Sequence, residues 1–209
     1  MQPFTVLTAV AAPLEITKID TGMILPGRYM RRHRRPDHDY GEAFLYDLRF
    51  DETGHPRETF VLNLPVYREA KILVTASDFG CGSSREGAAF AVMDFGLRAL
   101  IGPSFGEIFQ VNCTQNGIPA ITLPEAAIHD LWRELREQPG AQLIIDLPSQ
   151  VVVAPDQIAH AFDISPLRKD RLLRGIDDID VTLEYRDAIE KFEARRRATH
   201  PWLPTAHRE

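Results

Sequence analysis

The stretch that most constrains the fold is a glycine- and serine-rich turn between two apolar segments. The turn is Phe79–Glu86, with the sequence FGCGSSRE. Residues 70–76 before it (AKILVTA) predict a buried strand, and residues 87–93 after it (GAAFAVM) predict a buried helix. At such a junction the first N–H groups of the helix have no partner within the helix, and their dipoles favour negative charge. The sequence therefore predicts a strand, a turn and a helix that together bind a small anion.

Single residues exclude three common loop motifs at this turn. The residues after Gly82 or Gly87 do not supply the lysine of a phosphate-binding Walker A loop. Arg85 stands where a dinucleotide fingerprint needs glycine, and neither Ser83 nor Ser84 has both glycines of a nucleophile elbow. Two interpretations stay open. Arg85 can bind a carboxylate with its planar fork while Ser83 acts as a base, or the serines simply cap the helix and Arg85 lies on the surface.

The segments that follow predict an α/β fold. Strands are expected at 97–102 and 118–121, with a helix at 105–113 between them that Ser104 and Glu107 would begin as a capping box. Three short strands joined by two helices imply a parallel βαβ core. Beyond an amphipathic helix, three more strands predict an antiparallel meander. The ranges are 124–137 for the helix and 142–147, 150–154 and 160–164 for the strands.

The remaining segments predict further short elements of one domain that spans residues 1–209. A strand at 4–10 should end at Ala11–Pro13, residues 43–50 fit a strand or a short helix, and residues 59–63 fit a strand. Asp20 or Thr21 is expected to cap a short helical turn. Helices are expected at 166–174, with Gly175 as the stop, and at 182–197, and the tail from about 198 to 209 is expected to be disordered.

Composition limits the classes of function. The chain has 209 residues, 44% of them hydrophobic, and a formal net charge of −6, which argues against broad nucleic-acid binding. It has no long apolar run that would span a membrane, and its first ten residues lack the pattern of a signal peptide. We therefore expect a cytoplasmic protein with neither a nucleic-acid nor a membrane partner.

The candidate metal ligands are few. Cys81 and Cys113 are the two cysteines, and two thiols cannot supply the three or four ligands of an iron–sulfur cluster. The group His33, Asp37, His38 and Asp39 lies in the arginine-rich segment 28–40, and its spacing favours plain solvation over metal binding. We therefore expect no metal site on this chain.

The motifs together resemble a known family. Gly80–Glu86 is followed by SFGEIF at 104–109, Asn112 and Asn116–Gly117, and Ile19–Thr21 precedes it. This pattern, in collinear order over about residues 4 to 195, resembles the small subunit of bacterial 3-isopropylmalate dehydratase, which corresponds to the swivelling domain of aconitase. The resemblance implies a single β/β/α domain of the aconitase C-terminal type.

The resemblance also implies a reaction and a partner. A separate large subunit would carry a [4Fe–4S] cluster, and the pair would isomerise 2-isopropylmalate and 3-isopropylmalate in leucine biosynthesis by dehydration and rehydration. Ser83 would be the catalytic base. The groups that bind the hydroxy-dicarboxylate substrate would be Ser84, Arg85, Asp20, Thr21 and Arg28. The isolated chain would be inactive, and we expect that it can self-associate.

Two positions depart from the family pattern. Gly87 stands where family members typically have histidine, and Gly22 stands where they have a second aspartate. These departures leave two alternatives open: the small subunit of a related hydratase for another small diacid, of the maleate, citraconate or methylmalate type, and a non-catalytic binding partner. Nucleic-acid binding through Arg31–Arg35 is a weaker third alternative, and it would require salt-sensitive affinity.

Overall fold

The structure, a computed structural model, describes residues 1–31, 34 and 40–203. The chain divides into two compact units, residues 1–175 and 176–209, which are described separately below. The predicted single domain over residues 1–209 stays a prediction. Among the described residues, every helix is too short or too polar to cross a membrane.

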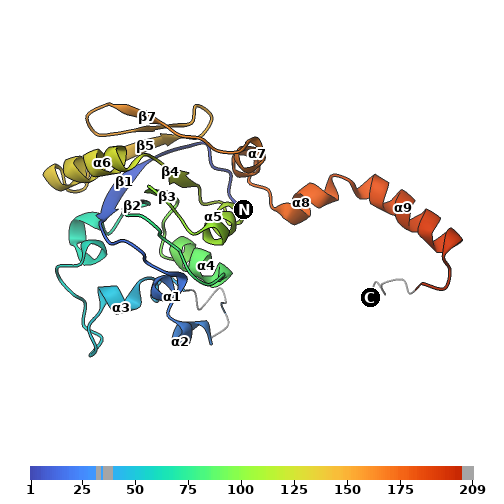
Figure 1. The fold of residues 1–209 in the computed structure, drawn as a ribbon, viewed down its shortest axis with the longest axis horizontal. Coiled ribbons are helices and arrows are strands. Elements are labelled where there is room, and N and C mark those ends of the chain that lie inside the picture. Colours follow the sequence, from blue (N-terminus) through green and yellow to red (C-terminus); the bar gives the residue numbers. More distant parts are fainter. Residues whose placement is uncertain (32–33, 35–39, 204–209) are drawn as a thin grey trace. The chain divides into compact units, whose positions relative to one another are not determined.

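The first unit is built on one seven-stranded sheet in the order β4-β3-β2-β1-β5-β6-β7 (Figure 1). The central strand β1 pairs in parallel with β2 and antiparallel with β5, and it therefore joins the two halves of the sheet. The parallel half confirms the predicted βαβ core, and the antiparallel half confirms the meander. The strands are β1 Val6–Leu14, β2 Ile72–Thr75, β3 Ala99–Gly102, β4 Ala120–Thr122, β5 Gln142–Asp146, β6 Val151–Val153 and β7 Ala159–Ala161.

Every residue of β2 and β3 is buried, so both faces of the parallel half of the sheet are covered, whereas β5 and β6 bury only alternate residues. Leu73 of β2 packs in the apolar cluster beneath α4 and α5, and its neighbour Val74 packs in the cluster beneath α6. The Trp132 indole of α6 also donates to Val74 O at 3.1 Å. The helices and 3₁₀ turns of this unit are α1 Thr21–Ile24, α2 Gly27–Met30, α3 Tyr46–Arg49, η1 Val61–Asn63, η2 Pro65–Tyr67, α4 Glu86–Asp94, α5 Glu107–Gln115, α6 Glu125–Glu137 and α7 Pro166–Arg174.

Two predicted elements of the first unit differ in the structure. Strand β1 does not end before Pro13 but continues to Leu14, with Pro13 opposite Val74. Proline is tolerated there because the pairing of β1 with β5 stops at Val10. The predicted strand at 59–63 is wrong: the segment forms η1, and the Asn63 side chain donates to Arg49 O and Arg57 O, which satisfies these carbonyls locally.

In the second unit, residues 176–203 form two helices where one was predicted. They are α8, Asp178–Leu183, and α9, Arg186–Thr199. Helix α8 begins before residue 182 because Asp177 caps it: the Asp177 carboxylate accepts from Asp180 N at 2.9 Å, and the Asp180 carboxylate accepts from Asp177 N at 3.1 Å. Neither helix contains a buried residue.

An ion pair ties residue 34 of the arginine-rich segment to the C-terminal end of α4. The Arg34 guanidinium donates to both oxygens of the Asp94 carboxylate, at 2.8 and 2.6 Å, and Tyr40 N donates to the same group at 3.0 Å. Burial opposes ionisation of Asp94, but the hydrogen bonds from Arg34 and Tyr40 outweigh it and hold the pKa of Asp94 below its ordinary value. Two further arginines of this segment, Arg32 and Arg35, lie outside the described residues.

We expect Asp94→Asn to lower the free energy of unfolding near pH 7 by about 1–2 kcal/mol, because the charge-assisted bonds are lost. The folded-state pKa of Asp94 is depressed, so its contribution is present above the unfolded pKa of about 3.9 and is lost as the pH falls through the folded pKa. Urea unfolding between pH 3 and 7 should show a wild-type advantage that shrinks toward acid. Asp47→Asn, in an exposed pair with Arg28, is the control and should cost much less. A pH-independent effect of Asp94→Asn would contradict an ionised Asp94.

Candidate functional site

The turn after β2 contains two glycines in a backbone conformation that other residues rarely adopt. Gly80 and Gly82 have φ of 74° and 87°, in the left-handed region that favours glycine. Gly80 also packs against Phe109 of α5 so closely that a Cβ atom would lie 2.2 Å from the ring. Gly80 N donates to Ile19 O at 2.7 Å. The turn is therefore held from α5 on one side and from the segment before α1 on the other.

The predicted loop around Asp20 lies directly beside this turn. Asp20 forms a parallel bridge with Cys81, and Thr21 N donates to Cys81 O at 3.0 Å. The Thr21 hydroxyl, on a side chain that is 2% exposed, donates to Ser83 O at 2.7 Å. Asp20 caps α1, as predicted, by accepting from Met23 N at 2.8 Å. The structure thus brings Asp20 and Thr21 to the Ser83 turn, although about 60 residues separate them in the sequence.

A backbone contact that the sequence did not reveal fixes the other side of the turn. Gly106 N donates to Phe79 O at 3.0 Å, and a Cβ atom at Gly106 would lie 2.1 Å from Gly80 O. The predicted capping box at Ser104 is wrong, because Gly106 is the N-cap of α5 and makes no side-chain cap bond. The Ser104 hydroxyl instead donates to Asp78 Oδ1 at 2.9 Å and accepts from Asp78 N at 2.8 Å.

The start of α4 is open to a ligand. Its N-cap residue, Arg85, makes no side-chain cap bond, and no hydrogen bond among the described residues joins the Ser83 or Ser84 hydroxyl to α4. The interpretation that the serines cap this helix is therefore wrong. Ser83 and Ser84 are exposed, and within the described residues no acceptor receives their backbone N–H groups. Arg85 is half-buried, and its guanidinium has no hydrogen bond or ion pair with any described residue. A guanidinium, two hydroxyls and free N–H groups therefore lie together at a helix N-terminus, an arrangement that suits a carboxylate.

The two glycines that depart from the family pattern have different neighbours. A Cβ atom at Gly22 would lie 3.4 Å from Arg85 Nη1. At Gly87, on the first turn of α4, a Cβ atom would meet Leu25, Met30 and Tyr40 at 3.0, 3.6 and 3.8 Å. Gly22 thus lies beside the candidate anion site, whereas Gly87 faces apolar and aromatic side chains. The sequence order alone does not reveal which side chains surround either glycine.

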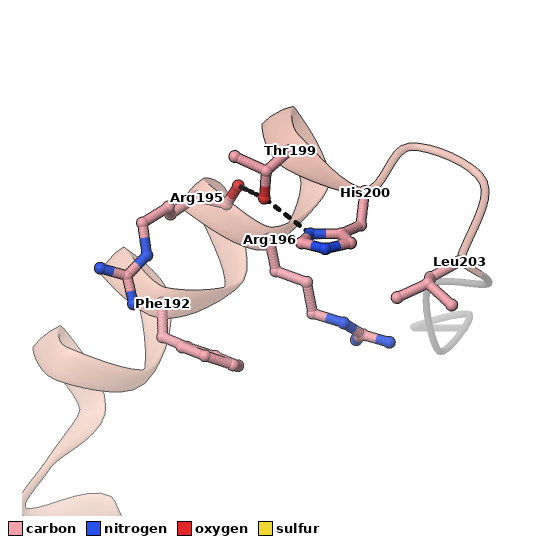
Figure 2. A pocket seen from close by; sticks show the side chains of 6 residues that line it. All are labelled: Phe192, Arg195, Arg196, Thr199, His200 and Leu203. Atoms are coloured by element: carbon pink, nitrogen blue, oxygen red, sulfur yellow. Dashed lines mark hydrogen bonds between the residues drawn. The ribbon is translucent and has the colours of Figure 1, made fainter.

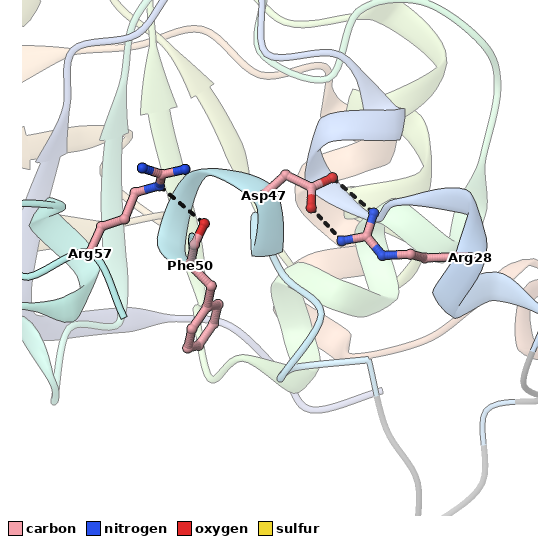
Figure 3. A network of polar contacts seen from close by, with 4 residues as sticks. All are labelled: Arg28, Asp47, Phe50 and Arg57. Atoms are coloured by element: carbon pink, nitrogen blue, oxygen red, sulfur yellow. Dashed lines mark hydrogen bonds and ion pairs between the residues drawn. The ribbon is translucent and has the colours of Figure 1, made fainter. Parts of the chain in front are cut away.

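Arg28 lies in a separate cluster. Its guanidinium donates to both carboxylate oxygens of Asp47 (Figure 3) and lies 4.8 Å from the Tyr29 ring centroid and 5.5 Å from that of Tyr46. The hydrogen bonds from Arg28 hold the pKa of Asp47 below its ordinary value. No hydrogen bond or ion pair joins this cluster to the Ser83 turn within the described residues. The predicted role of Arg28 in substrate binding stays a prediction.

The donor set of this chain does not fit an iron–sulfur cluster. The two cysteines are free; Cys113 is fully buried, and burial raises the pKa of its thiol, whereas Cys81 is half-buried in the turn. In the described ranges no three His, Cys, Asp or Glu side chains group as metal ligands. His33, Asp37, His38 and Asp39 lie outside the described residues.

A cleft of about 310 Å³ lies in the second unit, along the end of α9. Figure 2 shows its lining, in which Thr199 donates to Arg195 O at 2.9 Å and contacts His200 Nδ1 at 2.8 Å. The lining residues are Phe192, Arg195, Arg196, Thr199, His200 and Leu203. All six belong to the second unit, and the residues of the Ser83 turn belong to the first.

Comparison with known proteins assigns the chain to a family. The model of the aconitase C-terminal domain matches residues 1–126, and the model of the C-terminal domain of the 3-isopropylmalate dehydratase small subunit matches residues 178–206. A protein named 3-isopropylmalate dehydratase small subunit from Rhodospirillum centenum is 45% identical over 97% of this chain and 98% of its own length. The chain belongs to the 3-isopropylmalate dehydratase small-subunit family. A family member from Brevibacillus brevis is 41% identical over 94% of this chain and all of its own length.

A solved structure of the family has the same fold. The crystal structure of 3-isopropylmalate dehydratase from Methanocaldococcus jannaschii superposes with a TM-score of 0.61 at 21% sequence identity. The match covers 90% of this chain and 99% of the other. The predicted aconitase-type α/β fold is confirmed. The family resemblance expected from Gly80–Glu86 and the motifs around it is confirmed as well.

Proposed function

We propose that this chain is the small subunit of a two-chain hydro-lyase that interconverts 2-isopropylmalate and 3-isopropylmalate. The observation that carries the proposal is the start of α4, where Ser83 and Ser84 meet an Arg85 whose guanidinium has no partner among the described residues. The chain is also 45% identical over nearly its full length to a protein named as such a subunit. Leucine biosynthesis is the pathway in which this reaction belongs.

The Lewis acid that this reaction needs would lie on the partner chain, the large subunit. Because the cysteines of this chain cannot hold a cluster, we place a [4Fe–4S] cluster on a large subunit, where it would supply the Lewis acid for the substrate hydroxyl. The exposed turn is the part of this chain that would face it. Each of the two chains then contributes half of one active site.

The residues of this chain bind the substrate and move one proton. Arg85 binds a substrate carboxylate bidentately, and the N–H groups of Ser83 and Ser84 stabilise the negative charge that develops on it. Ser83 removes a proton from the carbon next to that carboxylate while the substrate hydroxyl leaves as water, which gives an alkene. In the rehydration, the hydroxyl of a water adds to the carbon that lost the proton, and the proton goes to the carbon that lost the hydroxyl. Serine is a poor base alone, so its activation depends on the positive charge around the turn. Thr21 positions Ser83 through its hydrogen bond to the Ser83 carbonyl.

The substrate assignment rests on the family, and two residues favour a second candidate. Gly22 and Gly87 change the surroundings of Arg85 and of the first turn of α4. The second candidate is therefore a related hydratase for a smaller diacid of the maleate, citraconate or methylmalate type.

A panel assay distinguishes the two candidates. The purified chain, its cognate large subunit and their mixture should be tested with 2- and 3-hydroxy-diacids that differ in their hydrocarbon substituent. We expect turnover by the mixture only, with the isopropyl substrates preferred. Preference for a diacid without the isopropyl group would favour the second candidate. Turnover by the isolated chain would contradict the two-chain proposal.

A further inference from the structure

Another cleft, of about 290 Å³, lies in the first unit and is lined by the end of α3, by η1 and by the residues that flank η2. Three of its lining side chains are polar and the others are apolar. The polar ones are Arg49, Asn63 and Arg68. The apolar ones include Phe50, Leu62, Leu64 and Phe95. The volume and the mixed lining suit a small organic molecule.

Hydrogen bonds fix the walls of this cleft. The Asn63 side chain donates to Arg49 O at 2.6 Å and to Arg57 O at 3.0 Å. Phe50 forms an antiparallel bridge with Pro56, and its carbonyl accepts from Arg57 Nε at 3.0 Å (Figure 3). Because these segments are already joined, a ligand in the cleft would need to order little additional chain.

The Arg49 guanidinium is held in place but lacks a counter-ion. Its Nη1 donates to Phe44 O at 3.1 Å, and its Cζ lies 5.0 and 4.7 Å from the ring centroids of Phe50 and Phe95. No described carboxylate forms an ion pair with it. Burial lowers the pKa of Arg49, and the charge of the Glu42 carboxylate offsets this only in part. A half-buried cation of this kind is stabilised by a bound anion.

Arg68 brings a second cation to the same cleft. Its side chain is exposed, and its guanidinium makes no hydrogen bond or ion pair with any described residue. No described acidic residue lines the cleft, so its charge favours an anion, and a guanidinium matches the geometry of a carboxylate. The rings and leucines of the lining favour a ligand with a hydrocarbon body over a bare inorganic ion.

We propose that this cleft binds a small organic carboxylate with a branched hydrocarbon body, and that its carboxylate binds Arg49 and Arg68. The hydrocarbon part packs against the rings of Phe50 and Phe95. The site goes beyond the proposed function, because none of the residues to which that function assigns catalysis or substrate binding lines this cleft.

The first test is a titration of the ¹⁵N-labelled full chain with sodium 4-methylpentanoate, followed by the NMR shifts of the backbone amides. We expect saturable shifts at residues 49–50, 62–64 and 68, with a Kd on the order of 1 mM. The uncharged 4-methylpentanamide and the short sodium acetate should each bind at least about fivefold more weakly. Absence of saturable shifts at these residues, shifts confined to residues 83–85, or equal affinity for the three compounds would overturn the proposal.

The second test is Arg68→Gln, which removes one of the two cations. Because the Arg68 side chain has no bond to a described residue, the variant should fold like the wild type. Its Kd for 4-methylpentanoate should rise about fivefold or more, since a charge-assisted hydrogen bond is lost. Arg133→Gln removes the same charge from an exposed pair with Asp130 on α6 and should change the Kd less than about twofold. An unchanged Kd for Arg68→Gln, or an equal rise for both variants, would overturn the proposal.

Discussion

Replacing Ser83 with alanine is expected to lower kcat of the reconstituted enzyme by about 10²- to 10⁴-fold, the usual contribution of a positioned acid–base group. KM should change little, because Arg85 and the backbone N–H groups that bind the carboxylate remain. The Ser83 side chain is exposed and forms no hydrogen bond with other described residues, so the stability of the chain should also be unchanged. Steady-state kinetics and a urea unfolding curve measure the two effects separately.

Ser84→Ala is the matched comparison for Ser83→Ala. It removes a neighbouring hydroxyl that is also exposed but keeps the N–H group that would bind the substrate carboxylate, so its loss in kcat should be much smaller. If both variants lost kcat equally, the assignment of the base to Ser83 would be wrong. Full turnover by Ser83→Ala would favour the non-catalytic alternative for this chain.

The second large effect is expected at Gly106. Gly106→Ala should lower the free energy of unfolding by about 3 kcal/mol, because its Cβ atom would lie 2.1 Å from Gly80 O and 2.7 Å from Gly80 C. The contacted atoms are backbone and cannot rotate away. If the chain relaxes instead, the turn with Ser83 must move, and kcat should fall. Urea unfolding and kinetics of the same variant distinguish these outcomes.

Gly27→Ala is the control for this substitution. A Cβ atom at Gly27 would have no heavy atom within 4 Å, and Gly27 lies at the exposed start of α2. Its free energy of unfolding should stay within about 1 kcal/mol of the wild-type value. A Gly106→Ala chain as stable and as active as Gly27→Ala would contradict the close contact between Gly106 and Gly80.

Local patterns predicted much of this fold. The spacing of Ile128, Leu131, Trp132 and Leu135 predicted α6 because a helix brings these positions to one face, and all four are buried. The glycines and serines between two apolar runs predicted the turn of the candidate site. These features depend on neighbours within a few residues, so the sequence alone contains them.

Features that depend on distant partners could not be predicted. Ser104 fits a capping box, but Asp78, 26 residues earlier, takes its hydroxyl. Residues 59–63 fit a strand, yet the Asn63 side chain bonds to Arg49 O and Arg57 O. Gly22 meets Arg85 only because Asp20 and Cys81 bridge their two segments. In each case a tertiary contact decides between alternatives that are locally equivalent.

The most direct test of the central claim is a titration of a fixed amount of the cognate large subunit with this chain, followed by the rate of isopropylmalate isomerisation. We expect no turnover by either chain alone, and a rate that rises and saturates as the complex forms. Ser83→Ala should form the same complex, measured by gel filtration, with little turnover. Turnover by the large subunit alone, or full turnover by the Ser83→Ala complex, would contradict an active site that this chain completes.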